Sequence, residues 1–355
     1  MKKVLTAVLA AVMLLGACSG QPAQPAEVLP PVVLPPVWES RQPYEVVFAV
    51  SRDAGGTLIG AARDFAAQLE ASTNGGLTAR VMLSAEPDED LLAGRAQIAL
   101  LNNRRQLEFC QPLAATATPF LYHNVPNFLM RANAGATINI LEFSLRENHG
   151  LVPLAAFYQG AGHLLINFSP GGYHHFLGAN ILLSPHEGAH EPFARLAGQD
   201  GQVTYYDTDL QRLESFLQGQ VNAVQVSADT LAGAYQSFLD LGHPLLEPAH
   251  LIVSYHDLTP VWLLANAGFM DGLPPGWQAE ITELQAQMAS RVNGTYLSRE
   301  DEILRELQSW TDLSVVFEFS HIRNRVFNTM PELEHGADAQ QRLARDLVEI
   351  MRRTA

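Results

Sequence analysis

Apolar and polar residues after position 43 follow two periods, one typical of strands and one typical of helices. Residues 44–50 form an apolar run that predicts a buried strand, and residues 77–83 predict another. Between these runs, Leu58, Ala62 and Phe65 recur at the spacing of one helix face. This order of strand, helix and strand is typical of a mostly parallel sheet with helices on both faces.

The same alternation continues toward the carboxyl end. Ile281, Leu284 and Met288 share one face of a late helix, and Leu343 and Leu347 share one face of a last helix. The chain is therefore predicted to be an α/β protein with two lobes and long C-terminal helices. Apolar runs between turn residues predict further strands at 151–157, 163–168, 180–184, 203–207, 222–227, 251–256 and 261–267.

The first 17 residues have the layout of an export signal. Lys2 and Lys3 precede an uncharged apolar run at 4–15, which is shorter than the ~20 residues of a membrane-spanning helix. Small residues then lead to Cys18, as in the signal of a bacterial lipoprotein. We expect cleavage before Cys18 and attachment of lipid, including palmitate, to this cysteine. The alternative is an ordinary secretory signal that contains a cysteine by coincidence.

Residues 18–43 are rich in proline, alanine and glutamine, which predicts an extended tether rather than a packed core. Roughly 310 residues follow, enough for two domains of ordinary size. We therefore expect a folded body on the periplasmic face of a bacterial membrane, held there by its lipid anchor.

The charge of the chain excludes several functions. Loss of Lys2 and Lys3 with the signal leaves 20 basic residues (22 less two) against 37 acidic ones, so the formal charge falls from −15 to −17. Such a chain lacks the clustered positive charge of a nucleic-acid surface. Every later basic residue is arginine, which excludes lysine Schiff-base chemistry and a P-loop lysine. We expect no cofactor.

Five segments resemble, in order, the motifs of one family of transport proteins. Residues 91–97 are similar to its leucine, x, x, glycine, x, x, aspartate element, with Gln97 at the aspartate. Residues 217–225 are similar to its glycine-containing element before an acid, with Gln225 in place of the glutamate. The other three segments are 66–77, 117–122 and 250–278. Over most of 44–325 the chain resembles the dicarboxylate-type substrate-binding proteins of tripartite ATP-independent periplasmic (TRAP) transporters.

This resemblance implies a periplasmic-binding-protein-like fold with mixed, mostly parallel sheets. It implies a monomer, not an enzyme, that closes by hinge motion on a small solute and delivers it to TRAP-type membrane subunits. The domains expected on this basis are the signal at 1–17, the tether at 18–43, lobe I at 44–160 plus about 250–290, and lobe II at about 161–249 plus 291–355.

The sequence departs from the family at the positions that usually bind a carboxylate. Leu182 stands where most members have an arginine, and a second common arginine falls at Gly162. Buried carboxylates without a cation are disfavoured, so we expect a solute that is not a simple dicarboxylate. A neutral, cationic or zwitterionic solute, or an acid carried with a metal ion, stays open. Arg52 or Arg104 could still supply a cation.

The candidate ligand-binding residues follow from the resemblance and from the ends of predicted strands, which line clefts in α/β proteins. Aromatic candidates beside strands are also common in protein cores. The complete set is Arg52, Asp53, Asn102, Asn103, Arg104, Phe120, Tyr158, Asn167 and Gln225.

A second interpretation concerns the segment from His186 to His190, which matches the zinc-protease pattern H-E-x-x-H. Such a site needs both histidines on one helix face and Glu187 as general base. Pro185, Gly188 and a nearby proline disfavour a helix here. An exported metal-dependent hydrolase and a TRAP-derived ligand sensor without a transport role therefore remain as alternatives.

Replacement of Cys18 by serine should abolish lipid attachment, because the thiol is the group to which the lipid is joined. Cells fed a palmitate analogue should label the native chain and leave Cys18→Ser unlabelled. Equal labelling of the two chains would contradict the expectation.

Overall fold

The computed structural model describes the folded body but not the amino terminus. Cys18, His186 and Glu187 lie outside the described residues, so the expectations placed on them stay predictions. His190 begins a helix, but its side chain also lies outside the description. The described residues are 43–184, 190–206, 208–240, 248–317, 319–320, 322–323 and 339–353.

The first sheet has five strands in the order β2-β1-β3-β10-β4. β1 pairs in parallel with β2 and β3, whereas β10 runs antiparallel to β3 and β4. Successive residues of β1 enter opposite cores, so both faces of the sheet are covered and the strand reads as one apolar run. The strands are β1 (Tyr44–Ser51), β2 (Leu77–Ser84), β3 (Ile98–Leu101), β4 (Leu151–Phe157) and β10 (Val261–Asn266).

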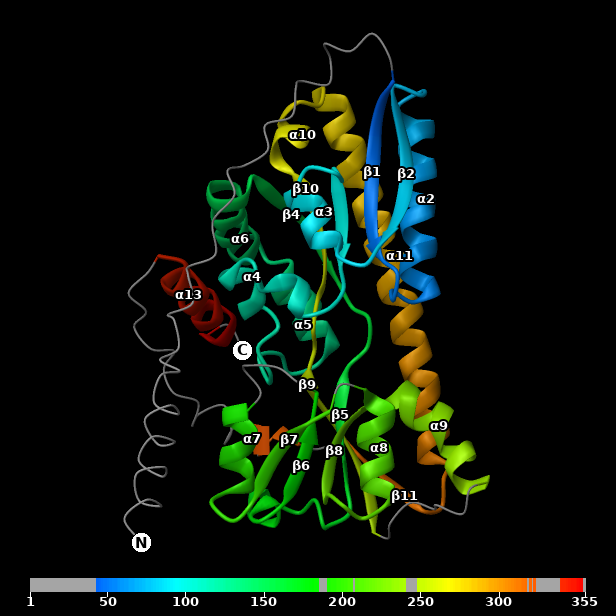
Figure 1. Cartoon of the computed structure of the whole chain (residues 1–355), viewed down its shortest axis with the longest axis vertical. Helices are drawn as coiled ribbons and strands as arrows, with labels where there is room; N and C mark the ends of the chain where they lie inside the picture. The colour runs from blue at the N-terminus through cyan, green and yellow to red at the C-terminus, as the bar shows by residue number, and fades with distance from the viewer. Residues whose placement is uncertain are drawn as a thin grey trace, which may run out of the picture. The chain divides into compact units, whose positions relative to one another are not determined.

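Helices cover the first sheet on both faces. On one face α2 packs against the long helix α11, and on the other α6 packs against β4. The last helix, α13, lies on α4 and α6 (Figure 1). These helices are α2 (Gly56–Ser72), α3 (Pro87–Leu92), α4 (Gln111–Ala115), α5 (Val125–Ala132), α6 (Gly135–His149), α10 (Ala267–Asp271), α11 (Pro275–Gln308) and α13 (Ala339–Arg353).

The second sheet has six strands in the order β11-β9-β5-β8-β6-β7. It is also mixed, since β5 runs antiparallel to both of its neighbours. Three helices pack on it, α7 (His190–Ala197), α8 (Asp209–Leu217) and α9 (Ala228–Asp240). The strands are β5 (Gly162–Ile166), β6 (Asn180–Leu183), β7 (Gln202–Tyr205), β8 (Ala223–Ser227), β9 (Ala249–Asp257) and β11 (Leu313–Val316).

Two short segments carry the chain between the sheets. Residues 158–161 follow β4 and lead into β5, and residues 258–260 follow β9 and lead into β10. Helix α11 contacts α2 and β4 of the first lobe and α9 and β11 of the second (Figure 1). Each lobe is thus one sheet with its helices, and the crossings and α11 join the two.

The two-lobed α/β fold predicted from the sequence is confirmed. Two segments differ in their placement from the expected lobe boundaries. β9 pairs with β5 of the second sheet, so the chain returns to the first lobe at 258–260 rather than near 250. α13 packs on the first lobe rather than the second, because its apolar residues Leu347, Val348 and Met351 enter the core beside α4 and α6. Within the described residues, no helix is long and apolar enough to cross a membrane.

Gly76 is required by a close approach between β2 and α11. A Cβ atom at this position would lie 2.4 Å from the Trp277 ring. Gly76→Ala should therefore lower the free energy of unfolding by about 1–3 kcal/mol, because the indole must shift. Gly60→Ala is the matched control, since a Cβ there meets nothing within 4 Å. Because position 60 lies in the interior of α2, Gly60→Ala should raise the free energy of unfolding by about 0.5–1 kcal/mol. Urea unfolding measures both, and equal effects would contradict the prediction.

Candidate functional site

A cavity of about 460 Å³ lies where the chain crosses between the sheets. Most of the residues in its wall are polar or charged, and they come from both lobes. The lining residues are Asn102, Asn103, Arg104, Arg105, Gln159, Gly160, Ala161, Gly162, Ser184, Asp209, Gln225, Ser227, Asp257 and Thr259.

Strand ends place most of these residues. β3 ends at Leu101, and the next four residues line the cavity. Ser184 follows β6, while Ser227 and Asp257 end β8 and β9. Open α/β sheets bind ligands outside the carboxyl ends of their strands, and this cavity has that position.

The carboxylate of Asp257 is the centre of a hydrogen-bond cluster in the cavity. Its Oδ2 accepts a hydrogen bond from Gln225 Nε2 at 2.8 Å. Its Oδ1 accepts one from the Thr259 hydroxyl at 2.8 Å and lies 3.4 Å from the Arg104 guanidinium. Three donors from three segments therefore converge on one carboxylate. Of these donors, Arg104 belongs to the first lobe, so its contact with Asp257 connects the two lobes.

Arg104 and Asp257 form an ion pair that is largely removed from water, with side chains 16% and 18% exposed. Burial lowers the pKa of the Arg104 guanidinium to about 10, and the nearby Asp257 carboxylate opposes this shift. The guanidinium also donates to the Ala117 carbonyl and approaches the Thr259 hydroxyl. Arg104 is thus still a cation at neutral pH, and it faces a protein carboxylate.

Gly162 lies directly beneath this cluster. A Cβ atom there would be 2.9 Å from Gln225 Nε2 and 3.0 Å from Asp257 Cβ. Any side chain at position 162 would therefore meet Gln225 and Asp257. Gly162 is one of the positions that the resemblance aligns with an arginine. The space that such an arginine would enter is filled by the Gln225 amide and the Asp257 side chain.

Leu182, the other position aligned with an arginine, does not line the cavity. Its side chain is 2% exposed and belongs to a buried cluster with Phe216 and Val224. Neither of the two aligned positions brings a cation into the cavity.

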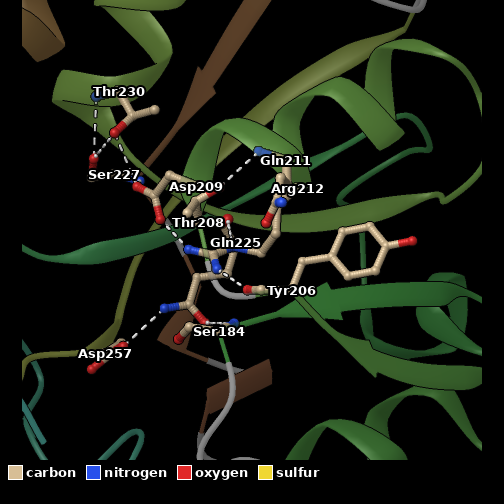
Figure 2. Close-up of polar contacts among 10 residues, drawn as sticks. All are labelled: Ser184, Tyr206, Thr208, Asp209, Gln211, Arg212, Gln225, Ser227, Thr230 and Asp257. Carbon is tan, nitrogen blue, oxygen red and sulfur yellow. Dashed lines mark hydrogen bonds and ion pairs between the residues drawn. The ribbon is translucent and has the colours of Figure 1, made fainter.

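A second cluster surrounds Asp209 at the start of α8 (Figure 2). Its Oδ2 accepts hydrogen bonds from the Ser227 amide at 3.2 Å and the Thr230 hydroxyl at 3.0 Å, and its Oδ1 pairs with Arg212. Arg212 in turn donates to the Gln225 carbonyl at 3.0 Å. Gln225 lies between this cluster and Asp257, so the two carboxylates of the cavity belong to one connected network (Figure 2).

A second cavity, of about 450 Å³, shares residues 159–161 and Ser227 with the first and extends to the start of α2 and to α11. Glu300 of α11 lies in its wall. The carboxylate accepts a hydrogen bond from the Tyr158 hydroxyl and lies 3.2 Å from His163 Nε2. Burial and the nearby Glu300 raise the pKa of Tyr158. Glu300 therefore binds α11 to both ends of the crossing from β4 to β5.

The structure brings together only part of the predicted site. Asn102, Asn103, Arg104 and Gln225 all line the first cavity. That they contact a solute stays a prediction.

The remaining candidates lie elsewhere. Arg52 and Asp53 are exposed on the turn after β1 and line neither cavity. Phe120 is 1% exposed and packs near Phe193 and Phe319 in the core of the second lobe. Tyr158 is buried, and the backbone N–H of Asn167 donates to the backbone carbonyl of Asn222. None of these five lines either cavity just described.

No candidate metal centre is present in the described part of the chain, where no three histidine, cysteine, aspartate or glutamate side chains come together. The segment from His186 to Glu187 falls outside the described residues, so its metal binding stays untested.

Sequence reasoning missed Asp257, Thr259, Gln159, Asp209 and Ser184. Ser184 ends a predicted strand and Asp257 directly follows one, so the rule that strand ends line clefts could have found them. Asp257 was missed because the expected boundary put the 251–256 strand in the first lobe.

No protein-family model matches the sequence, and no curated protein matches it. Solved structures do resemble it. A TRAP periplasmic solute-binding protein from Rhodobacter sphaeroides, in an apo open form, is 16% identical, with a TM-score of 0.73 over 88% of this chain and 98% of that one.

This chain has the fold of the TRAP periplasmic solute-binding proteins. A second such protein, from Desulfovibrio desulfuricans with bound sn-glycerol-3-phosphate, is 15% identical, with a TM-score of 0.62 over 87% of this chain and 97% of that one. A third, from Roseobacter denitrificans with bound β-D-glucuronate, is 16% identical, with a TM-score of 0.59 over 86% and 98%. At these identities the likeness establishes the fold.

Glu300→Ala should lower the free energy of unfolding by about 2–4 kcal/mol, because it leaves the buried Tyr158 hydroxyl and His163 imidazole without their acceptor. Glu302→Ala is the control, since Glu302 is exposed two residues along the same helix. It should change stability by less than about 0.5 kcal/mol. Urea denaturation measures both, and equal losses would show that the buried hydrogen bonds contribute little.

Proposed function

We propose that this chain is an extracytoplasmic solute-binding lipoprotein. It closes on a small polar solute in the first cavity and delivers it to TRAP-type membrane subunits. The observation that carries the proposal is the cavity of about 460 Å³ at the crossings, lined by polar side chains of both lobes. A ligand that contacts both lobes favours their closed arrangement by its differential affinity.

The fold supports this proposal, because proteins that share it were solved with small solutes bound. Their solutes include sn-glycerol-3-phosphate, orotic acid, β-D-glucuronate and β-D-galacturonate. The predicted export signal and the cysteine at its end support a location at the periplasmic face of a membrane, where such a protein works.

The solute of this chain is not a simple dicarboxylate. Leu182 and Gly162 supply no cation at the two aligned positions, and Leu182 packs into an apolar core. A carboxylate bound away from water requires a cation or several donors to offset its desolvation.

Binding should close the two lobes. A thermal-shift screen of the mature chain against succinate, malate, fumarate, sialic acid, amino acids, polyols and polyamines identifies a stabilising solute. Small-angle scattering at saturation should then show a smaller radius of gyration. An unchanged radius with a tightly bound solute would contradict closure.

Gln225→Ala should weaken that binding by about 1–2 kcal/mol, because Gln225 lines the cavity and holds Asp257 in place. Gln220→Ala is the matched control, since Gln220 is exposed on the turn before β8 and does not line the cavity. Titration calorimetry measures both affinities, and equal losses would place the solute outside the first cavity.

A further inference from the structure

We infer that Asp257 determines the specificity of the first cavity by excluding anions, so that the cavity takes an uncharged solute with hydroxyl or amide groups. The inference rests on the proposed function and names the class of solute for the same site.

Three donor groups surround the Asp257 carboxylate. Gln225, Thr259 and Arg104 all direct donors at its carboxylate, over 2.8, 2.8 and 3.4 Å. A guanidinium, an amide and a hydroxyl are the groups that would bind a carboxylate of a solute. In this chain they bind a carboxylate of the protein instead.

An anion that entered the cavity would meet the negative charge of Asp257. Arg104 is paired with Asp257, and both side chains are largely removed from water, so an entering carboxylate would meet a like charge beside the cation. Binding an anion there would require displacement of Asp257 from its three donors. Like-charge repulsion and desolvation act in the same direction and disfavour the anion.

The other described basic groups near the cavity are poor partners for an anion. Arg212 is paired with Asp209 and donates to the Gln225 carbonyl, so the Asp209 carboxylate already balances its positive charge. Arg105 lies in the wall but is exposed, and water and salt screen exposed charges.

The remaining wall suits an uncharged partner. The side-chain oxygen of Asn102 is buried and accepts no hydrogen bond from any described residue, so it can accept from a hydroxyl or amide group of a solute. Gln159, Ser184 and Ser227 add amide and hydroxyl groups. None of the described residues in this wall is aromatic, so the site offers no ring for stacking.

The test compares the native mature chain with Asp257→Asn, using succinate as the anionic probe. Asparagine keeps the shape and one acceptor for the Gln225 amide or the Thr259 hydroxyl, but it removes the charge that neutralises Arg104. Succinate affinity should rise by about ten- to hundredfold, the effect of one charge-assisted hydrogen bond. Addition of Arg104→Gln should remove the gain.

Asp64→Asn is the matched control, because it frees Arg291 from an ion pair of 2.5 Å on the exposed surface of the first lobe. It should leave succinate affinity unchanged. The native chain alone gives a second readout, independent of any variant. Erythritol, an uncharged polyol, should raise its melting temperature more than equal concentrations of succinate or spermidine.

Two results would overturn the inference. One is an unchanged succinate affinity in a folded Asp257→Asn chain, and the other is a greater stabilisation of the native chain by succinate or spermidine than by erythritol. If the native chain binds succinate and its lobes close, the proposed function stands and only the solute class is wrong. If no solute of any class binds or closes the lobes, the proposed function fails as well.

Discussion

The Asp257 carboxylate connects three segments of the cavity wall through its hydrogen bonds and its ion pair. Asp257 ends β9 just before the chain returns to the first sheet, so its position is set by the second lobe. Its partners Gln225, Thr259 and Arg104 come from β8, from the crossing and from the first lobe. A partly buried charge is stabilised when its oxygens accept hydrogen bonds, and here those partners supply them. The same contacts therefore stabilise the crossing and set the charge of the cavity.

The other crossing is anchored by a different carboxylate, on a different element. Glu300 of α11 accepts from Tyr158, before the crossing, and lies beside His163, after it. α11 packs on both lobes, so the hydrogen bonds connect the crossing to a helix that both lobes contact. Hinge motion takes place at a few residues between packed units. Closure of the lobes would therefore concentrate at 158–161 and 258–260, the two segments that border the cavity.

The sequence predicted the strands well because their apolar runs reflect burial on both faces, as β1 shows by sending successive residues into two cores. It predicted part of the lining of the first cavity, since Asn102 and Arg104 follow a strand end. It could not predict that β9 lies beside β5, because strand order depends on distant pairing. Asp257 was missed for that reason. Phe120 was expected in the cleft, but its backbone adopts a φ of 60° and its ring enters the core of the second lobe.

Net charge alone would not determine which solutes the proposed site excludes. The formal charge, −15 for the full chain and −17 without the predicted signal, creates a field that repels anions, but salt screens it within about 8–10 Å. A pair held away from water, such as Arg104 with Asp257, is screened far less. The bound solutes of structures with this fold include a phosphate ester and uronates, so the fold itself does not exclude anions. The class of solute then depends on a few local groups, and in this cavity a carboxylate of the protein already occupies the donors that an anion would need.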